Sequence, residues 1–363
     1  MTELDLKLDR IKDLLAKYGV NALLLQRSAS FAWATCGGSS YINTATDFGV
    51  GSLLITPTGR YLITNNIEAP RFEREEHLAA QGWEFKLAPW YETNDAVAKL
   101  TRGLKLASDS AFPGAIDLGS DVAHLRADLL PEEGERFREV SRLCASAMDT
   151  AIRAIRPGMT EFEIAAVLNR ETQARGVLPI VCLIATDERI FNYRHPLPTD
   201  KKMDKYAMLV LCGRKYGLVC SLTRLVHFGA LPGELRRKME AIAQIDATFI
   251  TATRPGVTCG EVFRQATDVY AATGFPTEWQ WHHQGGPAAY EPREWVATPT
   301  STEVVKVGQV YAWNPSITGA KSEDTILIGA NGNEILTQIP DWPLLPIEMG
   351  GQTVNRPAIL EVV

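Results

Sequence analysis

One pattern occurs twice in the chain and constrains its fold more than any other feature. Residues 155–163 read IRPGMTEFE and residues 253–261 read TRPGVTCGE, so both contain Arg-Pro-Gly-x-Thr-x-x-Glu. In each copy the threonine and the glutamate three residues later suit a capping box, in which each side chain accepts from the other residue's backbone amide. Each copy also lies between two amphipathic segments. The pattern therefore predicts a duplicated helix–turn–helix unit.

Segments with the character of strands follow both predicted helix pairs. Residues 206–212 and 216–224 read as two strands joined by a turn. Residues 308–317, 323–329 and 333–337 read as an antiparallel meander. Helices packed on one face of an antiparallel sheet form an α+β domain, so we expect one here, with an internal pseudo-twofold repeat.

The first part of the chain has a different pattern. Residues 4–17 show helical spacing, residues 21–25 read as a buried strand and residues 51–64 as a hairpin. A chain of 363 residues exceeds one ordinary core, so two domains are expected. We predict a smaller α/β domain over residues 1–138 and a larger α+β domain over residues 139–363.

Composition excludes several classes of function. The net charge is −6 and no block of five like charges occurs, which argues against nucleic-acid or membrane partners. The amino terminus is charged and lacks the apolar core of a signal peptide. None of the six cysteines forms a CxxC pair, which favours a reduced compartment. We therefore expect a cytoplasmic protein.

The predicted strand LVCSLTR, residues 218–224, is unusually polar for a buried sheet. Because side chains alternate along a strand, Ser221 and Thr223 share one face and Arg224 lies on the other. Further polar residues gather in four later segments, NYRHPLPTD, WHHQGGPAAYEPRE, YAWNPSI and KSEDTI. Each segment alone has an ordinary explanation, such as a hydrogen-bonded turn histidine or a strand end. Their polar side chains are His195, His282, His283, Tyr290, Arg293, Asn314, Ser316, Lys321 and Glu323.

The order of these segments resembles the creatinase/aminopeptidase P/methionine aminopeptidase superfamily, peptidase family M24, which has the pita-bread fold. The resemblance covers about residues 140–340 by motif, and the amino-terminal part fits the creatinase/prolidase-type extension in size and position. In that family five acidic or histidine side chains hold two metal ions, which activate a water for amide hydrolysis.

The chain departs from the family at three of those five positions. Val210 and Ser221 stand where the family has two aspartates, and Asn314 replaces the glutamate of a Glu-Pro pair. Only His282 and Glu323 match. Valine cannot coordinate a metal, and serine and asparagine are weak neutral ligands. We therefore expect the two-metal centre to be absent and predict no metal and no other cofactor.

Creatinase offers a precedent within the family. It has the same His-x-x-Gly motif followed by an Arg-Glu pair, matching Arg293 and Glu294, and it works without metal. Its histidine carries a proton between water and the leaving nitrogen. The resemblance implies that His282 is the catalytic acid and base, assisted by Glu323 and His195. Without a metal, the His282 imidazole is expected to titrate near neutral pH.

We expect the other polar side chains to bind a small polar substrate, with the cationic ones favouring a carboxylate. They are His283, Asn314, Ser316, Ser221, Thr223, Arg224, Tyr290, Arg293 and Lys321. The hypothesis is a metal-independent, creatinase-like hydrolase that cleaves an amidine- or amide-type C–N bond, and the resemblance implies a homodimer.

Two alternatives stay open. One is an Xaa-Pro peptidase-like metallohydrolase with altered ligands, including a single ion held by His282, His283, Glu323 and a cysteine. The other is a non-catalytic pseudoenzyme that binds a small molecule, because a fold alone does not fix a function.

Overall fold

The computed structural model describes residues 1–363, which form two compact units, Met1–Glu132 and Glu133–Val363. The chain divides between them after Glu132, near the start of a long helix, Pro131–Ala154, whereas the sequence predicts a boundary at residues 138/139, inside that helix. The rise in polarity on which that prediction rests belongs to the first turns of the helix.

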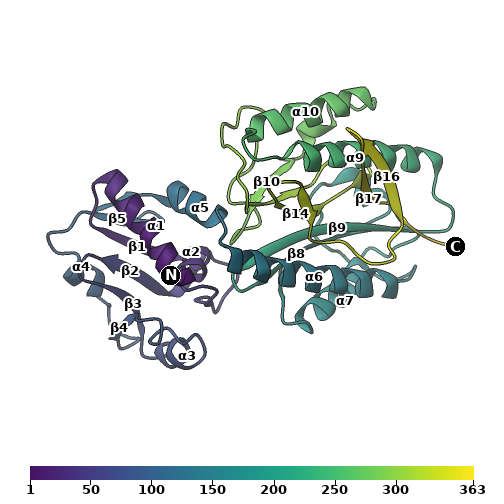
Figure 1. The fold of residues 1–363 in the computed structure, drawn as a ribbon. Coiled ribbons are helices and arrows are strands. Elements are labelled where there is room, and N and C mark those ends of the chain that lie inside the picture. Colours follow the sequence, from purple (N-terminus) through teal and green to yellow (C-terminus); the bar gives the residue numbers. More distant parts are fainter. The chain divides into compact units, whose positions relative to one another are not determined.

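The first unit contains the following elements: α1 Glu3–Tyr18, β1 Ala22–Arg27, α2 Ser28–Ala34, β2 Phe48–Thr56, β3 Gly59–Asn65, α3 Ala69–Arg74, β4 Glu84–Ala88, α4 Ala96–Leu100, β5 Leu106–Ser108, β6 Ala115–Asp117 and α5 Gly119–Ala127. Its strands form one mixed sheet in the order β4-β3-β2-β1-β5-β6, as the predicted α/β domain requires (Figure 1). The predicted helix 4–17 and hairpin 51–64 correspond to α1 and to β2–β3.

The second unit contains these elements: α6 Pro131–Ala154, α7 Glu161–Gln173, β7 Leu178–Thr186, α8 Glu188–Asn192, β8 Tyr206–Lys215, β9 Leu218–Phe228, α9 Gly233–Ala252, α10 Cys259–Ala272, the 3₁₀-helix η1 Glu278–Trp281, β10 Gly285–Ala288, β11 Val310–Trp313, β12 Ser316–Ile317, β13 Ala320–Lys321, β14 Asp324–Ile328, β15 Asn333–Ile335, β16 Leu344–Met349, β17 Gln352–Pro357 and β18 Leu360–Val362. Within this unit, α9 and α10 lie on one side of the strands and α6 and α7 on the other (Figure 1).

Both predicted capping boxes are present. The Thr160 amide donates to Glu163 Oε2 at 2.7 Å, and the Glu163 amide donates to Thr160 Oγ1 at 3.1 Å. Thr258 and Glu261 make the same exchange at 2.8 and 3.2 Å. These boxes begin α7 and α10, which each follow a long helix. The predicted helix pairs are therefore confirmed, while the pseudo-twofold relation between them stays a prediction.

Two four-stranded sheets of the second unit meet at its polar residues. One sheet has the order β18-β9-β8-β7 and the other β10-β11-β14-β15. An antiparallel bridge between Thr223 of β9 and Glu323, the residue before β14, joins them, and the Thr223 amide donates to the Glu323 carbonyl at 3.1 Å. Residues far apart in the sequence are thereby held side by side.

The core fixes the strand that leads to Asn314. Phe249 of α9 stacks on Trp313 at the end of β11, with ring centroids 4.6 Å apart. The Trp313 indole N–H donates to Thr253 Oγ1 at 2.9 Å, so this buried aromatic ring keeps a hydrogen-bond partner. Asn314 follows directly, and its position is set by this packing. None of the helices combines the length and apolar character needed to span a bilayer.

Candidate active site

Glu323 lies at the junction of the two sheets and is held by three side chains. Thr223 Oγ1 donates to Glu323 Oε2 at 2.7 Å, Lys321 Nζ lies 3.0 Å from the same oxygen, and an Arg293 terminal nitrogen donates to Oε1 at 3.0 Å. Burial alone would raise the pKa of Glu323, but Lys321 and Arg293 outweigh it and lower the pKa to about 2. Glu323 is therefore a carboxylate already neutralised by cations of its own chain.

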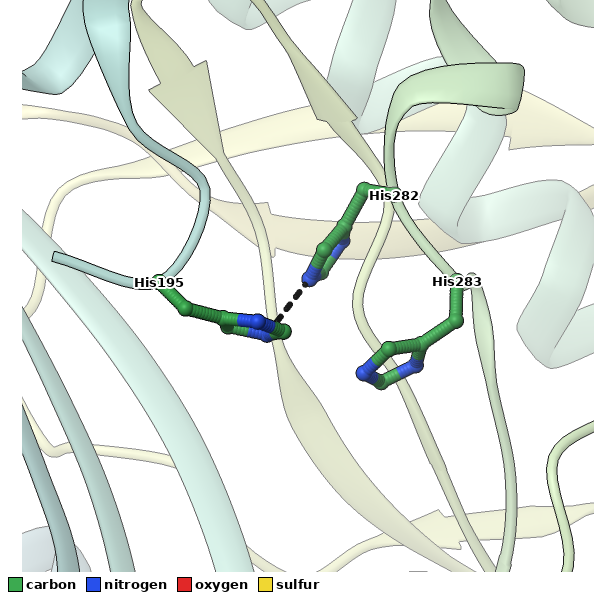
Figure 2. Close-up of side chains that lie close together, drawn as sticks. All are labelled: His195, His282 and His283. Carbon is green, nitrogen blue, oxygen red and sulfur yellow. Dashed lines mark hydrogen bonds between the residues drawn. The ribbon is translucent and has the colours of Figure 1, made fainter.

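Three histidines converge beside this cluster. Figure 2 shows His195, from the loop after α8, facing His282 and His283, which follow η1. The Nε2 atoms of His195 and His282 are 3.0 Å apart, so one ring donates to the other. Ligand-type nitrogens of all three lie within 4.8 Å of one another. The three histidines therefore have a geometry that could hold a single metal ion.

The Gly-Gly pair after the histidines lets this segment pack closely on β11. Gly285 has φ +106°, and a Cβ there would lie 2.1 Å from the Ala312 carbonyl oxygen. Any side chain at this position would push β10 away from β11. The Gln284 side-chain amide also donates to the His282 carbonyl at 2.6 Å. The backbone at His282 is therefore held from within the segment.

The surroundings keep the imidazoles neutral. Burial lowers the pKa of His282 to about 2, and Lys321 adds to the effect. Burial and Arg293 lower the pKa of His283 to about 4, and burial and Lys321 lower that of His195. The prediction that His282 titrates near neutral pH is therefore wrong, because burial and the positive charge of Lys321 both disfavour the protonated imidazole.

A cavity of about 440 Å³ opens beside the cluster. Its polar lining consists of residues predicted from the sequence, and its remaining wall is largely apolar. The lining residues are His195, His283, Arg293, Asn314, Lys321 and Glu323, with Val181, Leu183, Val210, Cys212, Pro292 and Val296. Val181 and Leu183 were not predicted, although their spacing of two in β7 places both on one face.

His282 does not itself line this cavity. It is 7% exposed and lines a separate cavity of about 10 Å³ together with Ser316 and Lys321. His195, which it contacts, lines the larger cavity. The structure therefore brings His195 into contact with His282 and places His195 and Glu323 in the wall of one cavity. Their catalytic roles stay a prediction, and His195 is nearer to the cavity than His282.

Ser316 lines only the smaller cavity, and four more residues predicted to bind substrate do not line the larger one either. Ser221 is fully buried and its Oγ lies 3.2 Å from Cys212 Sγ, while Thr223 donates to Glu323. The Tyr290 hydroxyl donates to Glu133 Oε1 at 2.6 Å. Arg224 faces the other way, as alternation predicts, and donates to Asp324 Oδ1 at 2.8 Å. These four side chains therefore contact Cys212, Glu323, Glu133 and Asp324 and help to fix the positions of those residues.

Asp324 belongs to a second buried charge cluster behind the site. It pairs with both Arg224 and Arg356, and Arg356 also pairs with Asp246 at 2.7 Å. These four side chains are at most 3% exposed. Burying charges is tolerated only when each is paired, and this cluster meets that condition.

The residues at the family's metal positions do not fit two metal ions. Val210 offers no ligand atom, and the Ser221 oxygen accepts from Arg293 at 3.3 Å. Glu323, one of two matching ligands, has both oxygens paired with cationic side chains. Two divalent ions here would face Lys321 and Arg293 without enough carboxylates to balance them.

Comparison with known proteins places the chain among peptidases and their relatives. An uncharacterized peptidase of Staphylococcus saprophyticus is 25% identical over 231 residues, which are 61% of this chain and 65% of the relative, just under two thirds of its length. An Xaa-Pro dipeptidase of Pyrococcus horikoshii is 23% identical over 353 residues, 92% of this chain and 97% of that protein. An agropine synthesis cyclase of Rhizobium rhizogenes is 25% identical over 309 residues, 70% and 75%.

Solved structures show the same fold. The Xaa-Pro dipeptidase from Bacillus anthracis has a TM-score of 0.80 at 18% identity and covers 99% of this chain and 100% of its own. The prolidase from Pyrococcus horikoshii has a TM-score of 0.79 at 20% identity, covering 92% and 98%. The predicted α+β pita-bread fold with an amino-terminal domain is thereby confirmed. The model of metallopeptidase family M24 matches residues 135–330, more than half of the chain, and the chain therefore belongs to that family.

Proposed function

We propose that this chain is a hydrolase that cleaves a C–N bond of a small polar compound without the two metal ions of its family. The observation that carries the proposal is the 3.0 Å contact between His195 and His282, with His195 in the cavity wall. Two imidazoles that share a proton form an acid–base pair, which suits a reaction that takes a proton from water and returns it.

The reaction that these groups support is simple hydrolysis. A water adds to the carbon of an amide or amidine and loses a proton to the His195–His282 pair. The C–N bond then breaks, and the same proton passes to the leaving nitrogen. Such proton transfer contributes about 10²–10⁴-fold to a rate. No oxidant, reductant or other reactant is needed.

Glu323 has a supporting role in this proposal. Both oxygens of this carboxylate are paired with cationic side chains, so it is poorly placed to take a proton from water. Its two oxygens instead hold Lys321 and Arg293 at the edge of the cavity. We propose that these cations stabilise negative charge as it develops on the substrate. A small-molecule substrate, a homodimer and a cytoplasmic location remain parts of the proposal that rest on the sequence alone.

A second candidate activity comes from one relative. The Rhizobium rhizogenes protein is named as a synthesis cyclase, and its alignment covers 70% of this chain. Closing a ring with loss of water is hydrolysis in reverse, so an acid–base pair beside a cavity serves either direction. Cyclic amides and esters therefore belong in any substrate panel.

The test combines metal analysis with turnover. The full chain is purified without a metal-binding tag, analysed for zinc, manganese, cobalt and iron, and assayed on amides, amidines, N-acyl compounds and their cyclic forms, with and without chelator. We expect turnover that persists with chelator and is lost in His195→Asn. One bound ion per chain that is released in His283→Asn would instead support a single-ion metallohydrolase. No turnover across the panel would favour a binding protein.

A further inference from the structure

The wall of the larger cavity carries an excess of positive charge. Its charged residues are Arg293, Lys321 and Glu323, two cations and one anion, which leave a net charge of +1. Their side chains are 9%, 5% and 3% exposed, respectively. Water screens such buried charges poorly, so the excess acts strongly on whatever enters the cavity.

Hydrogen-bonding capacity at these groups is not used up. The Lys321 ammonium has three N–H groups and one acceptor, Glu323 Oε2, at 3.0 Å. The Arg293 Nε is buried without an acceptor, and the Asn314 Oδ1 is buried without a donor. Buried polar atoms normally have partners, so these two atoms of cavity-lining residues leave hydrogen-bonding capacity for a ligand.

The rest of the cavity wall has a different character. Val181, Leu183, Val210 and Val296 line it from β7, β8 and the loop after β10. The volume of about 440 Å³ is within the range of sites for small organic ligands. A ligand that fits this wall has one anionic end and one apolar portion.

We propose that the cavity binds a small monocarboxylate, whose carboxylate oxygens accept from Lys321 and Arg293 and whose apolar portion packs on the valine and leucine side chains. The place where the family binds cations has become a place that binds an anion. One negative charge balances the net +1, which favours a monocarboxylate over a dicarboxylate. The lowered pKa values of the neighbouring histidines agree with a positive field here. This inference rests on the proposed function only for what happens to the carboxylate compound after it binds. A binding measurement by itself tests whether the carboxylate site exists.

The experiment compares ligands that differ only in charge. The probes are N-acetylglycine, N-acetylleucine and N-acetylphenylalanine, each with its neutral primary amide, titrated into the full chain by calorimetry. We expect at least one acid to bind about tenfold or more tightly than its amide, because a buried charge pair discriminates strongly. Inorganic phosphate serves as a control anion that lacks an apolar portion.

Matched variants separate the site from general charge effects. Lys321→Met and Arg293→Met each remove one cation from the wall, and we expect each to abolish the preference for acid over amide. Lys321→Arg keeps the charge and should keep the preference. Lys238→Met removes a lysine that contacts the Thr318 carbonyl and does not line this cavity, so it should bind like the parent. Thermal melts identify any variant that fails to fold, and two independent cation variants keep the test decisive.

The outcomes for binding and for activity are distinct. The inference is overturned if no acid binds at millimolar concentration, if acid and amide bind equally, if phosphate binds more tightly than every acid, or if both folded Met variants keep the preference. A chain that binds these acids but cleaves nothing supports the carboxylate site and contradicts the proposed hydrolase. Turnover of the N-acyl amino acids that is unchanged in Lys321→Met supports the hydrolase and contradicts the carboxylate site.

Discussion

Lys321 Nζ lies 3.0 Å from Glu323 Oε2, in a cavity wall where the M24 family places its metal ions. Arg293 pairs with the other oxygen at 3.0 Å. Glu323 is the one acidic metal-ligand position that the chain retains, and both of its oxygens are therefore paired with cationic side chains of the protein. This arrangement explains how a glutamate can persist there while Val210 and Asn314 replace its former partners.

Replacing His282 by Asn should reduce turnover about 10²–10⁴-fold without unfolding the protein, because the acid–base pair with His195 is lost. Steady-state kinetics and circular dichroism together check this. The matched control is His77→Asn, an exposed histidine of the first unit with φ +52°, a conformation that asparagine accepts well. Full activity in the His282 variant would contradict the proposed mechanism.

The acidic limb of the pH–rate profile should lie well below pH 6.5. Burial and Lys321 lower the pKa of His195 and His282, so both imidazoles are already neutral near pH 7 and accept a proton only in more acidic solution. The dependence of kcat/KM on pH reports these groups in the free enzyme. Lys321→Met should move the limb upward, because it removes a cation that faces both rings. A limb near 6.5 in the parent chain would show that the rings are not held neutral.

Stability should fall as the pH is lowered from about 7 to about 5. The pKa of His282 is lowered to about 2 in the folded state, so in this window only the unfolded chain takes up the proton, at a cost to stability of about 2 kcal/mol. Glu323 contributes little here, because its pKa is about 2 in the folded state and 4.5 in the unfolded chain, so it stays mostly ionised in both states over this window. Urea unfolding at both pH values checks this. The loss should be smaller in His282→Asn, and an equal loss in both proteins would contradict the assignment.

Removing Arg356 should destabilise the fold by about 3–5 kcal/mol, because Arg356→Met leaves Asp246 unpaired and Asp324 with one cation in a buried site. Chemical unfolding measures the change. Arg236→Met provides the control, since its pair with Glu361 is exposed and such pairs contribute at most about 1 kcal/mol. Similar losses of unfolding free energy in the two variants would contradict the larger contribution expected of the buried cluster.

Local signals in the sequence predict the parts of the fold that local chemistry determines. The capping boxes at Thr160 and Thr258 require only a threonine and a glutamate three residues apart, and both form. Strand alternation places Arg224 opposite Ser221 and Thr223. The alternation of side chains along a strand cannot identify the ion-pair partner of Arg224, because Asp324 is 100 residues away in the chain.

The site itself was predicted only in part. The family motifs suggest that His195 and His282 belong to one site. Their separation of 87 residues in the sequence does not by itself show that they are close in space. The suppressed titration of His282 was missed because it depends on burial and on Lys321, which tertiary packing brings to it. The apolar wall was also missed, since Val181 and Leu183 resemble ordinary core residues in sequence.

Relatives that bind metal ions must acquire them from their surroundings, and they compete for that supply with every other metalloprotein in the cell. The positive charges beside Glu323 are attached to the backbone at Lys321 and Arg293 and are made with each new copy of the chain. Starvation for trace elements leaves these charges in place. Under the proposed function, the positive charge of this pocket therefore depends on translation of the chain and not on the supply of metal ions.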